Sequence, residues 1–216
     1  RAKTAEKLEN SLQQKDNLLL EIVEALAASV EAKDPYTSGH QKRVGVLAGA
    51  IAQKMELSPD DIKGIGIAGT IHDIGKIQIP GEILCKPSKL LHEEFNLIKT
   101  HSKAGYDIIK NIEFPYPVAD VLLQHHERLD GSGYPQSLCG DEILLGAKIV
   151  AVADVVEAIS SYRPYRPALG IGKALEEIDR LKGIQFDVQV VEACLSLFKD
   201  DGFELFGEWR NRRINQ

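Results

Sequence analysis

The sequence has no long apolar run, no paired cysteines and no excess of basic residues. No stretch of the 216 residues is apolar over the length that a membrane span requires. The three cysteines, Cys85, Cys139 and Cys194, are far apart, which predicts reduced thiols and a cytoplasmic location. The net charge of −6 argues against sequence-independent binding to nucleic acid, because that needs a broad basic surface. We therefore expect no DNA binding and no direct membrane contact.

The composition is otherwise that of a folded domain, with 44% hydrophobic residues. The chain starts at Arg1, without an initiator methionine, and already has helical character there. We therefore expect a piece of a longer protein, with room upstream for a sensor or a membrane segment.

Glycine and proline are absent from residues 1–33, which are rich in Leu, Glu, Lys and Ala. Seven positions follow one another at alternating spacings of three and four residues, as in a heptad repeat: Ala5, Leu8, Leu12, Lys15, Leu19, Ile22 and Leu26. One interpretation is a parallel coiled-coil stalk that joins two copies into a homodimer. The other is an amphipathic helix packed on its own domain. The stalk is slightly favoured.

Helical periodicity continues through most of the remaining chain. The stretch DPYTSG at residues 34–39 breaks the first helix, and Ser58 followed by Pro59 predicts the start of another. Further helices are predicted in the ranges 44–55, 93–109, 118–125, 143–160, 168–181 and 188–199. Few segments alternate with a period of two, so we predict an all-α bundle.

Polar residues stand in apolar surroundings at several of these helices. In TIHDIGKIQIP, residues 70–80, His72 and Asp73 are flanked by isoleucines, and burial of such groups is costly unless they are paired or bind metal. His125 and His126 are adjacent, and Asp154 is an isolated acid in an apolar run. Imidazole and carboxylate together suit Mn, Fe, Co or Zn better than Mg alone. A carboxylate can also bridge two metals.

Six motifs then follow in a fixed order: DPYTSGH, HDIGK, a single histidine at 101, HHERLDGSGYP, Asp154 and RPYRP. In type, order and spacing they resemble the HD-GYP family, a branch of the HD-domain metal-dependent phosphohydrolases, over about residues 30–200. The resemblance implies an HD-domain helical bundle at 30–205, preceded by a linker helix at 1–29 and followed by a tail at 206–216.

The resemblance also implies a centre with two divalent transition metals, Fe or Mn in the first place and Zn, Co or Ni as alternatives. The implied ligands are His40, His72, Asp73, His101, His125, His126 and Asp154. Asp73 would bridge the metals, which activate a water molecule between them. The sixth histidine, His92, is interpreted as a surface residue.

The implied substrate is cyclic di-GMP, hydrolysed to pGpG and in some members onward to GMP. The residues implied to contact it are Lys76, Arg163, Arg166, Gly133, Tyr134 and Pro135, with Lys76 also implied in catalysis. Lys76 would face the site if the helix of His72 continued that far; otherwise it is a helix-end lysine. Arg163 and Arg166 suit phosphate or a guanine edge, or form a solvated loop. Tyr134 either stacks on a base or packs its loop.

Five positions depart from the family pattern: Tyr36, Leu129, Ser137, Tyr162 and Val188. A glutamate at the position of Tyr36 recruits a third metal in some members, so two metals are expected here. Arg128 and Asp130 are interpreted either as a loop-ordering ion pair or as site residues.

The resemblance predicts the output domain of a bacterial signalling protein, which a cyclase domain or another signalling partner could accompany. Two other functions stay open. One is hydrolysis of a related dinucleotide, cyclic GMP-AMP. The other is a silent module that binds the dinucleotide or a partner. The tail with Trp209 and the basic run at 210–213 is interpreted as a solvated end.

Overall fold

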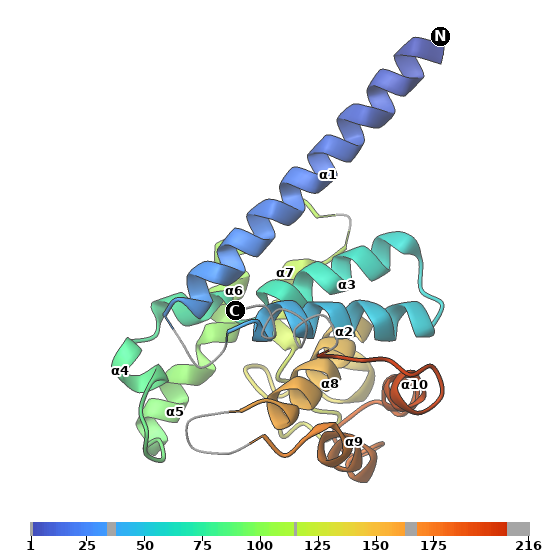
Figure 1. Ribbon diagram of the computed structural model, residues 1–216. Coiled ribbons are helices and arrows are strands. Elements are labelled where there is room, and N and C mark those ends of the chain that lie inside the picture. Colours follow the sequence, from blue (N-terminus) through green and yellow to red (C-terminus); the bar gives the residue numbers. More distant parts are fainter. Residues whose placement is uncertain (1, 34–37, 115, 163–167, 207–216) are drawn as a thin grey trace, which may run out of the picture.

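The structure, a computed structural model, describes residues 2–33, 38–114, 116–162 and 168–206 (Figure 1). The elements in chain order are α1 (Ala2–Glu31), α2 (His40–Lys54), α3 (Pro59–Ile71), the 3₁₀ helix η2 (Ile74–Gln78), α4 (Gly81–Leu84), α5 (His92–Lys99), α6 (His101–Ile109), α7 (Val118–Gln124), the 3₁₀ helix η3 (Gly140–Glu142), α8 (Leu145–Ser160), α9 (Ile171–Arg180) and α10 (Val188–Lys199). No strand occurs in these ranges apart from two isolated bridges. The predicted all-α class is confirmed.

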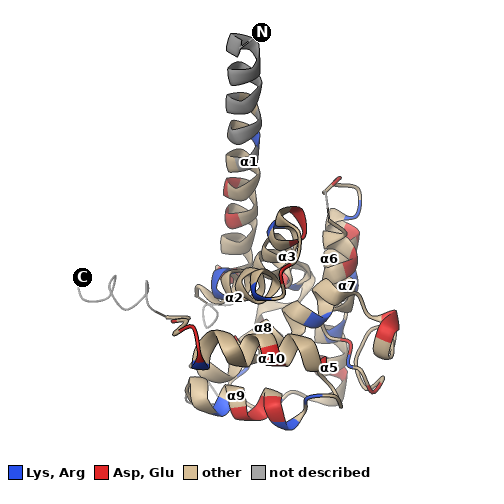
Figure 2. Cartoon of the chain, turned by 90° about the vertical axis from the view of Figure 1, so that its right-hand side faces the viewer, with Lys and Arg blue, Asp and Glu red and all other residues tan. Residues whose placement is uncertain are grey.

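The core lies where α2, α3 and α8 pack together. Helix α8 is buried on most of its surface, which explains its apolar, alanine-rich sequence. Ser58 caps α3 as predicted, because its hydroxyl oxygen accepts a hydrogen bond from the backbone N–H of Asp61 at 3.2 Å. None of the described helices is both long enough and apolar enough to cross a membrane. Acidic and basic residues are interspersed over the body in the view of Figure 2.

Helix α1 contacts the body only through its C-terminal part and extends away from it at the N-terminus (Figure 1). Val23, Ala27 and Val30 are buried against the body, whereas Leu20 and Ile22 are exposed. The interpretation as a helix packed on its own domain is therefore right for the C-terminal part of α1. Coiled-coil pairing of the remaining part stays a prediction.

The C-terminal end of α1 is hydrogen-bonded to two other segments. The Glu31 carboxylate accepts hydrogen bonds from the backbone N–H groups of Gly39, at 2.9 Å, and Gln41, at 3.2 Å. Just beyond the helix, the Lys33 ammonium donates to the carbonyl oxygen of Ile77 at 2.6 Å. The end of α1 is thus attached both to the start of α2 and to η2.

Two helices end earlier than the sequence pattern indicates. The helix expected around 93–109 is divided into α5 and α6, which meet at Thr100. Helix α3 ends at Ile71, and η2 follows, so Lys76 does not continue the helix that precedes His72. Gly75 explains this change, since glycine is a poor helix former and η2 packs directly on α6. A Cβ atom at Gly75 would overlap with the carbonyl oxygen of His101.

Candidate metal centre

Five helical segments contribute the side chains of one buried cluster. His40 is the first residue of α2, His72 and Asp73 directly follow α3, and His101 is the first residue of α6. The remaining members come from the end of α7 and the middle of α8 and are His125, His126 and Asp154. The structure thus brings together all seven residues that were predicted as metal ligands.

Asp73 lies at the centre of this cluster. Its side chain belongs to two groups whose potential ligand atoms lie within 4.8 Å of one another. One group is Asp73 with His40 and His72; the other is Asp73 with His101, His125 and His126. One carboxylate oxygen, Oδ2, lies 3.4 Å from His72 Nε2, and the other, Oδ1, lies 3.3 Å from His101 Nε2. The two oxygens of Asp73 therefore face different sets of histidines.

Asp154 completes the first of the two groups. Its Oδ1 atom lies 3.3 Å from His40 Nε2 and 3.7 Å from His72 Nε2. The two halves of the cluster are then a first half of His40, His72 and Asp154 and a second half of His101, His125 and His126. Asp73 stands between them.

The histidine rings are held by hydrogen bonds on the side away from the cluster centre. The Nδ1 atoms of His72, His101 and His125 lie 2.8, 2.6 and 2.7 Å from backbone carbonyl oxygens three residues earlier. Donation from Nδ1 to these carbonyls leaves Nε2 as the acceptor atom, which is the atom that faces the cluster. The rings are therefore oriented for metal binding.

The protonation states also favour metal binding. Burial lowers the pKa of His101, and burial together with neighbouring imidazoles lowers the pKa values of His125 and His126 further, so these rings are neutral. Burial raises the pKa of Asp73, but Lys76 and His72 outweigh burial and hold it well below its usual value.

His40 behaves differently in the metal-free protein. Burial lowers the pKa of His40, but hydrogen bonds with Asp154 and Glu157 outweigh it and raise the pKa to about 9. The same pairing holds the pKa of Asp154 well below its usual value, although burial opposes this. Because a metal ligand must be a neutral imidazole, His40 has to release a proton when it binds metal.

The donor set fits divalent transition metals. Within the described ranges, Asp73 Oδ1 is a buried oxygen without a hydrogen-bond partner, although buried polar atoms are normally paired. A metal ligated by this oxygen would satisfy it. Five imidazoles and two carboxylates are typical ligands of Mn, Fe, Co and Zn.

Lys76 reaches the cluster from η2. Its Nζ atom lies 2.6 Å from Asp73 Oδ2, and the side chain is partly exposed. The expectation that Lys76 faces the site is thus met, but the reason given for it was wrong. A 3₁₀ turn, and not a continued α-helix, directs its ammonium group to the cluster.

The loop at residues 127–139 lies beside the second half of the cluster. The Tyr134 ring stacks on His126, with ring centroids 4.7 Å apart, and burial raises the pKa of its phenol, which stays protonated. Gly133 lets the loop return against its own start, because a Cβ atom there would overlap with the backbone of Glu127. Pro135, the third predicted contact in this loop, is exposed.

Two buried acids were missed in the sequence. Glu127 accepts hydrogen bonds from the backbone N–H groups of Gln136, at 2.7 Å, and Leu138, at 3.1 Å, and so holds the loop of Tyr134. Glu157 is fully buried and pairs with His40. A usable signal was present for Glu157, because it stands one helical turn after Asp154 in the same apolar helix.

The remaining predicted positions have different outcomes. His92 is exposed, as expected of a surface residue. Within the described part of the chain, no ion pair joins Arg128 to Asp130. Asp130 accepts from Ser132, at 3.0 Å from its backbone N–H and 2.6 Å from its hydroxyl, and Arg128 lies over the Phe186 ring. Tyr36, Arg163, Arg166 and the tail with Trp209 lie outside the described residues.

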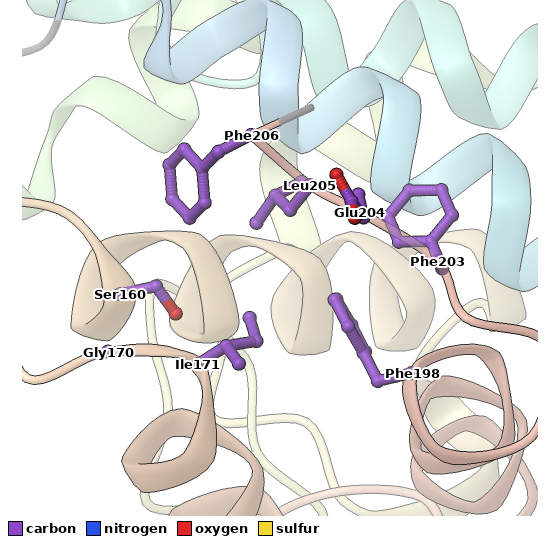
Figure 3. A pocket seen from close by; sticks show the side chains of 8 residues that line it. All are labelled: Ser160, Gly170, Ile171, Phe198, Phe203, Glu204, Leu205 and Phe206. Carbon is purple, nitrogen blue, oxygen red and sulfur yellow. The ribbon is translucent and has the colours of Figure 1, made fainter. Parts of the chain in front are cut away.

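A separate cavity of about 340 Å³ lies beside α8, between α9, α10 and the last described segment (Figure 3). Its walls are largely apolar and are formed by Ser160, Gly170, Ile171, Phe198, Phe203, Glu204, Leu205 and Phe206. None of the seven clustered residues lines it.

The chain resembles curated proteins over most of its length. It is 41% identical over 177 residues to the cyclic di-GMP phosphodiesterase response regulator RpfG of Xanthomonas campestris, covering 81% of this chain and 47% of that protein. It is 42% identical over 187 residues to a cyclic di-GMP phosphodiesterase of Thermotoga maritima, covering 86% of this chain and 51% of that protein. The 3'3'-cGAMP-specific phosphodiesterase 3 of Vibrio cholerae is 40% identical over 194 residues, and the match covers 88% of this chain and 42% of that protein. The chain thus spans about half the length of these relatives.

Solved structures share the fold. Bd1817, an HDG"Y"P protein from Bdellovibrio bacteriovorus, aligns with a TM-score of 0.63 and 21% identity, covering 86% of this chain and 60% of that one. A cyclic GMP-AMP specific phosphodiesterase of V. cholerae, V-cGAP3, aligns with a TM-score of 0.62 and 19% identity, covering 82% of this chain and 49% of that one.

The family profile of the HD domain matches residues 24–190, which is most of the chain. This range includes every residue of the cluster. The chain therefore belongs to the HD domain family, which confirms the family resemblance inferred from its motifs.

Proposed function

We propose that this chain is a metal-dependent phosphodiesterase domain that hydrolyses cyclic di-GMP to pGpG, with further hydrolysis to GMP as a second step. The observation that carries the proposal is Asp73, whose two oxygens face two separate sets of histidines. Such an arrangement suits a pair of metals with a shared carboxylate. Two relatives at 41% and 42% identity are named cyclic di-GMP phosphodiesterases, which supports the choice of substrate.

The metals proposed are two divalent transition-metal ions, Fe or Mn in preference to Zn, Co or Ni. The first half of the cluster would hold one and the second half the other, with Asp73 shared between them. When bound, such a pair acts as a Lewis acid toward phosphate and lowers the pKa of a water molecule.

The reaction joins the oxygen of one water to a phosphorus of the ring and breaks its bond to a ribose 3′-oxygen, which leaves with a proton. Lys76 is proposed to hold a phosphate oxygen by its positive charge, since its ammonium group lies at the cluster. Gly133, Tyr134 and Pro135 would contact the dinucleotide from the loop beside His126. Arg163 and Arg166 are proposed as further phosphate or guanine contacts.

A second candidate is hydrolysis of cyclic GMP-AMP. The relative at 40% identity from V. cholerae is named for this substrate, and the cluster suits the same chemistry on either dinucleotide. A third candidate, a catalytically silent module that binds the dinucleotide, ranks lower because all seven predicted ligands are present.

The deciding experiment incubates purified protein, loaded with Mn²⁺ or Fe²⁺, with cyclic di-GMP and 3'3'-cyclic GMP-AMP in parallel and separates the products by chromatography. We expect about two metals per chain and pGpG from cyclic di-GMP, and loss of both in Asp73→Ala. Cleavage of the hybrid dinucleotide alone would favour the second candidate. A well-metallated protein that cleaves neither would favour the third.

We further propose that the domain is the cytoplasmic output of a bacterial signalling protein, that it works alongside a cyclase domain, and that it dimerises through α1. Ile22, a heptad position, is 49% exposed, which leaves it available to a second copy. Light scattering is expected to give a dimer for the wild type and a monomer for Ile22→Glu. Leu20→Glu is the matched control, because Leu20 is similarly exposed at 44% but lies outside the heptad positions. A monomeric wild type would refute dimerisation.

A further inference from the structure

Glu157 is a fully buried carboxylate on α8, one turn after Asp154. A buried charge in an apolar helix is costly unless hydrogen bonds and opposite charges compensate it. Both of its oxygens are hydrogen-bonded, and their partners indicate what Glu157 does.

The Oε2 atom of Glu157 pairs with His40 Nδ1. The other held histidines, His72, His101 and His125, use carbonyl oxygens three residues earlier in their own segments. His40 is the first residue of α2 and directly follows Gly39, whose φ is 72°. Its Nδ1 atom pairs instead with a side chain 117 residues away.

The Oε1 atom of Glu157 has other partners. It accepts hydrogen bonds from Arg43 Nε at 2.7 Å and from the Ser161 hydroxyl at 2.6 Å. Ser161 directly follows the last residue of α8. One carboxylate thus joins a cluster histidine to Arg43 of α2 and to the end of α8.

Arg43 extends the same network toward the cavity of Figure 3. Its guanidinium donates to the carbonyl oxygen of Ser38 at 3.2 Å and lies 5.5 Å from the ring centre of Phe206. Arg43 therefore contacts Glu157 through Oε1, the oxygen that is not paired with His40. The positive charge of Arg43 compensates the negative charge of the carboxylate at Oε1. The other oxygen, Oε2, orients the ring of His40.

We propose that Glu157 is a positioning residue that fixes the ring of His40 for metal binding at the first half of the cluster. Arg43 and Ser161 hold the other oxygen of the same carboxylate, so its position does not depend on His40 alone. The proposal rests on the proposed function only in treating His40 as a metal ligand, and its effect on metal affinity is measurable without substrate.

The first experiment measures Mn²⁺ affinity by titration of metal-free protein. Glu157→Gln keeps the shape of the side chain, and its folding is checked by circular dichroism. We expect its Mn²⁺ affinity to fall about 10- to 100-fold, as is usual when the partner of a metal-binding histidine is lost. Glu157→Asp keeps the charge and is expected to recover part of the affinity. Glu94→Gln, a change to an acid that pairs with Lys86 instead, is expected to leave the affinity unchanged.

The second experiment measures the Mn²⁺ affinity of Ser161→Ala. This change removes one partner of Glu157 Oε1 and leaves the pair of Glu157 with His40 in place. The affinity is therefore expected to stay within about twofold of the wild type.

Wild-type Mn²⁺ affinity in a folded Glu157→Gln variant would overturn the positioning role. A loss of affinity in Ser161→Ala equal to that in Glu157→Gln would also overturn it, because the pair with His40 would then not be the cause. A wild type that binds Mn²⁺ but cleaves no cyclic dinucleotide would refute the proposed function, and these two measurements would still decide the role of Glu157.

Discussion

The two halves of the histidine cluster are built in different ways. The second half comes from two consecutive helices, α6 and α7, and two of its rings are held by carbonyl oxygens of Ile98 and Leu122. The first half combines the start of α2, the end of α3 and the middle of α8. There the ring of His40 depends on Glu157, far away in the chain.

This difference shows how a metal site divides between local and long-range structure. A carbonyl oxygen three residues earlier is present whenever the local turn forms, and no side-chain substitution removes it. A carboxylate on another helix is present only when the core has packed. Local turns therefore orient His101 and His125 in the second half and His72 in the first, whereas the ring of His40 is oriented by tertiary packing.

The largest effects are expected when one metal ligand is replaced in either half of the cluster. His40→Ala and His126→Ala should each leave about one metal per chain and reduce hydrolysis more than about 100-fold, because the half that loses a histidine keeps too few ligands to hold its metal. Elemental analysis and product chromatography measure the two quantities. Two metals retained in either variant would contradict the division into halves.

Metal removal should lower the free energy of unfolding of the domain. It should also increase local opening more in some helices than in others. At free metal 100-fold above its dissociation constant, binding contributes about 2.7 kcal/mol, which corresponds to a melting temperature about 5–10 °C higher. Thermal unfolding before and after chelation tests this. Hydrogen exchange should increase more in α2 than in α6, since α2 depends on tertiary contacts. Equal increases would argue against the contrast between the halves.

Lys76 contacts the shared Asp73 and belongs to neither half. Lys76→Met is expected to keep both metals and to lower kcat/KM about 10- to 100-fold, the usual loss for one charged hydrogen bond. Steady-state kinetics with metal analysis on the same samples measures this, and Lys76→Arg is expected to recover part of the rate. Loss of metal in Lys76→Met would instead assign Lys76 to the structure of the cluster.

The smallest effect is expected at Tyr134, beside the second half. Tyr134→Phe keeps the ring that stacks on His126 and should change kcat/KM less than about threefold. Tyr134→Leu removes the ring and should raise KM about tenfold, if a base stacks there. Equal effects of the two variants on KM would identify the hydroxyl, and not the ring, as the contact.

The sequence predicted the helices better than their ends. Periodicity in the ranges 118–125 and 143–160 gave α7 and α8, and Ser58 gave the start of α3. The break at Thr100 and the 3₁₀ turn of η2 were not predicted. Both depend on how α6 and η2 pack against each other, which a single-helix pattern does not contain.

The clustered residues were accessible from the sequence because few residue types ligate transition metals and their motifs are unusual. The residues that hold the clustered side chains and their loop in place were not identified from the sequence. Glu127 pairs with backbone groups, so no local pattern distinguishes it from a surface acid. Glu157 stands one helical turn after Asp154 in an apolar helix, which indicates burial, but its distant partner His40 is visible only in the structure. The direction of Lys76 was expected, but its cause, a tight turn at Gly75, was visible only in three dimensions.

The attachment of α1 has a mechanical consequence. Glu31 holds backbone groups on both sides of His40, and Lys33 holds Ile77, the neighbour of Lys76. The end of α1 is therefore hydrogen-bonded to the backbone beside a cluster histidine and to the backbone beside Lys76. A displacement of this helix end would act on both segments together. A site that needs ligand atoms within a few tenths of an ångström has little tolerance for such a strain.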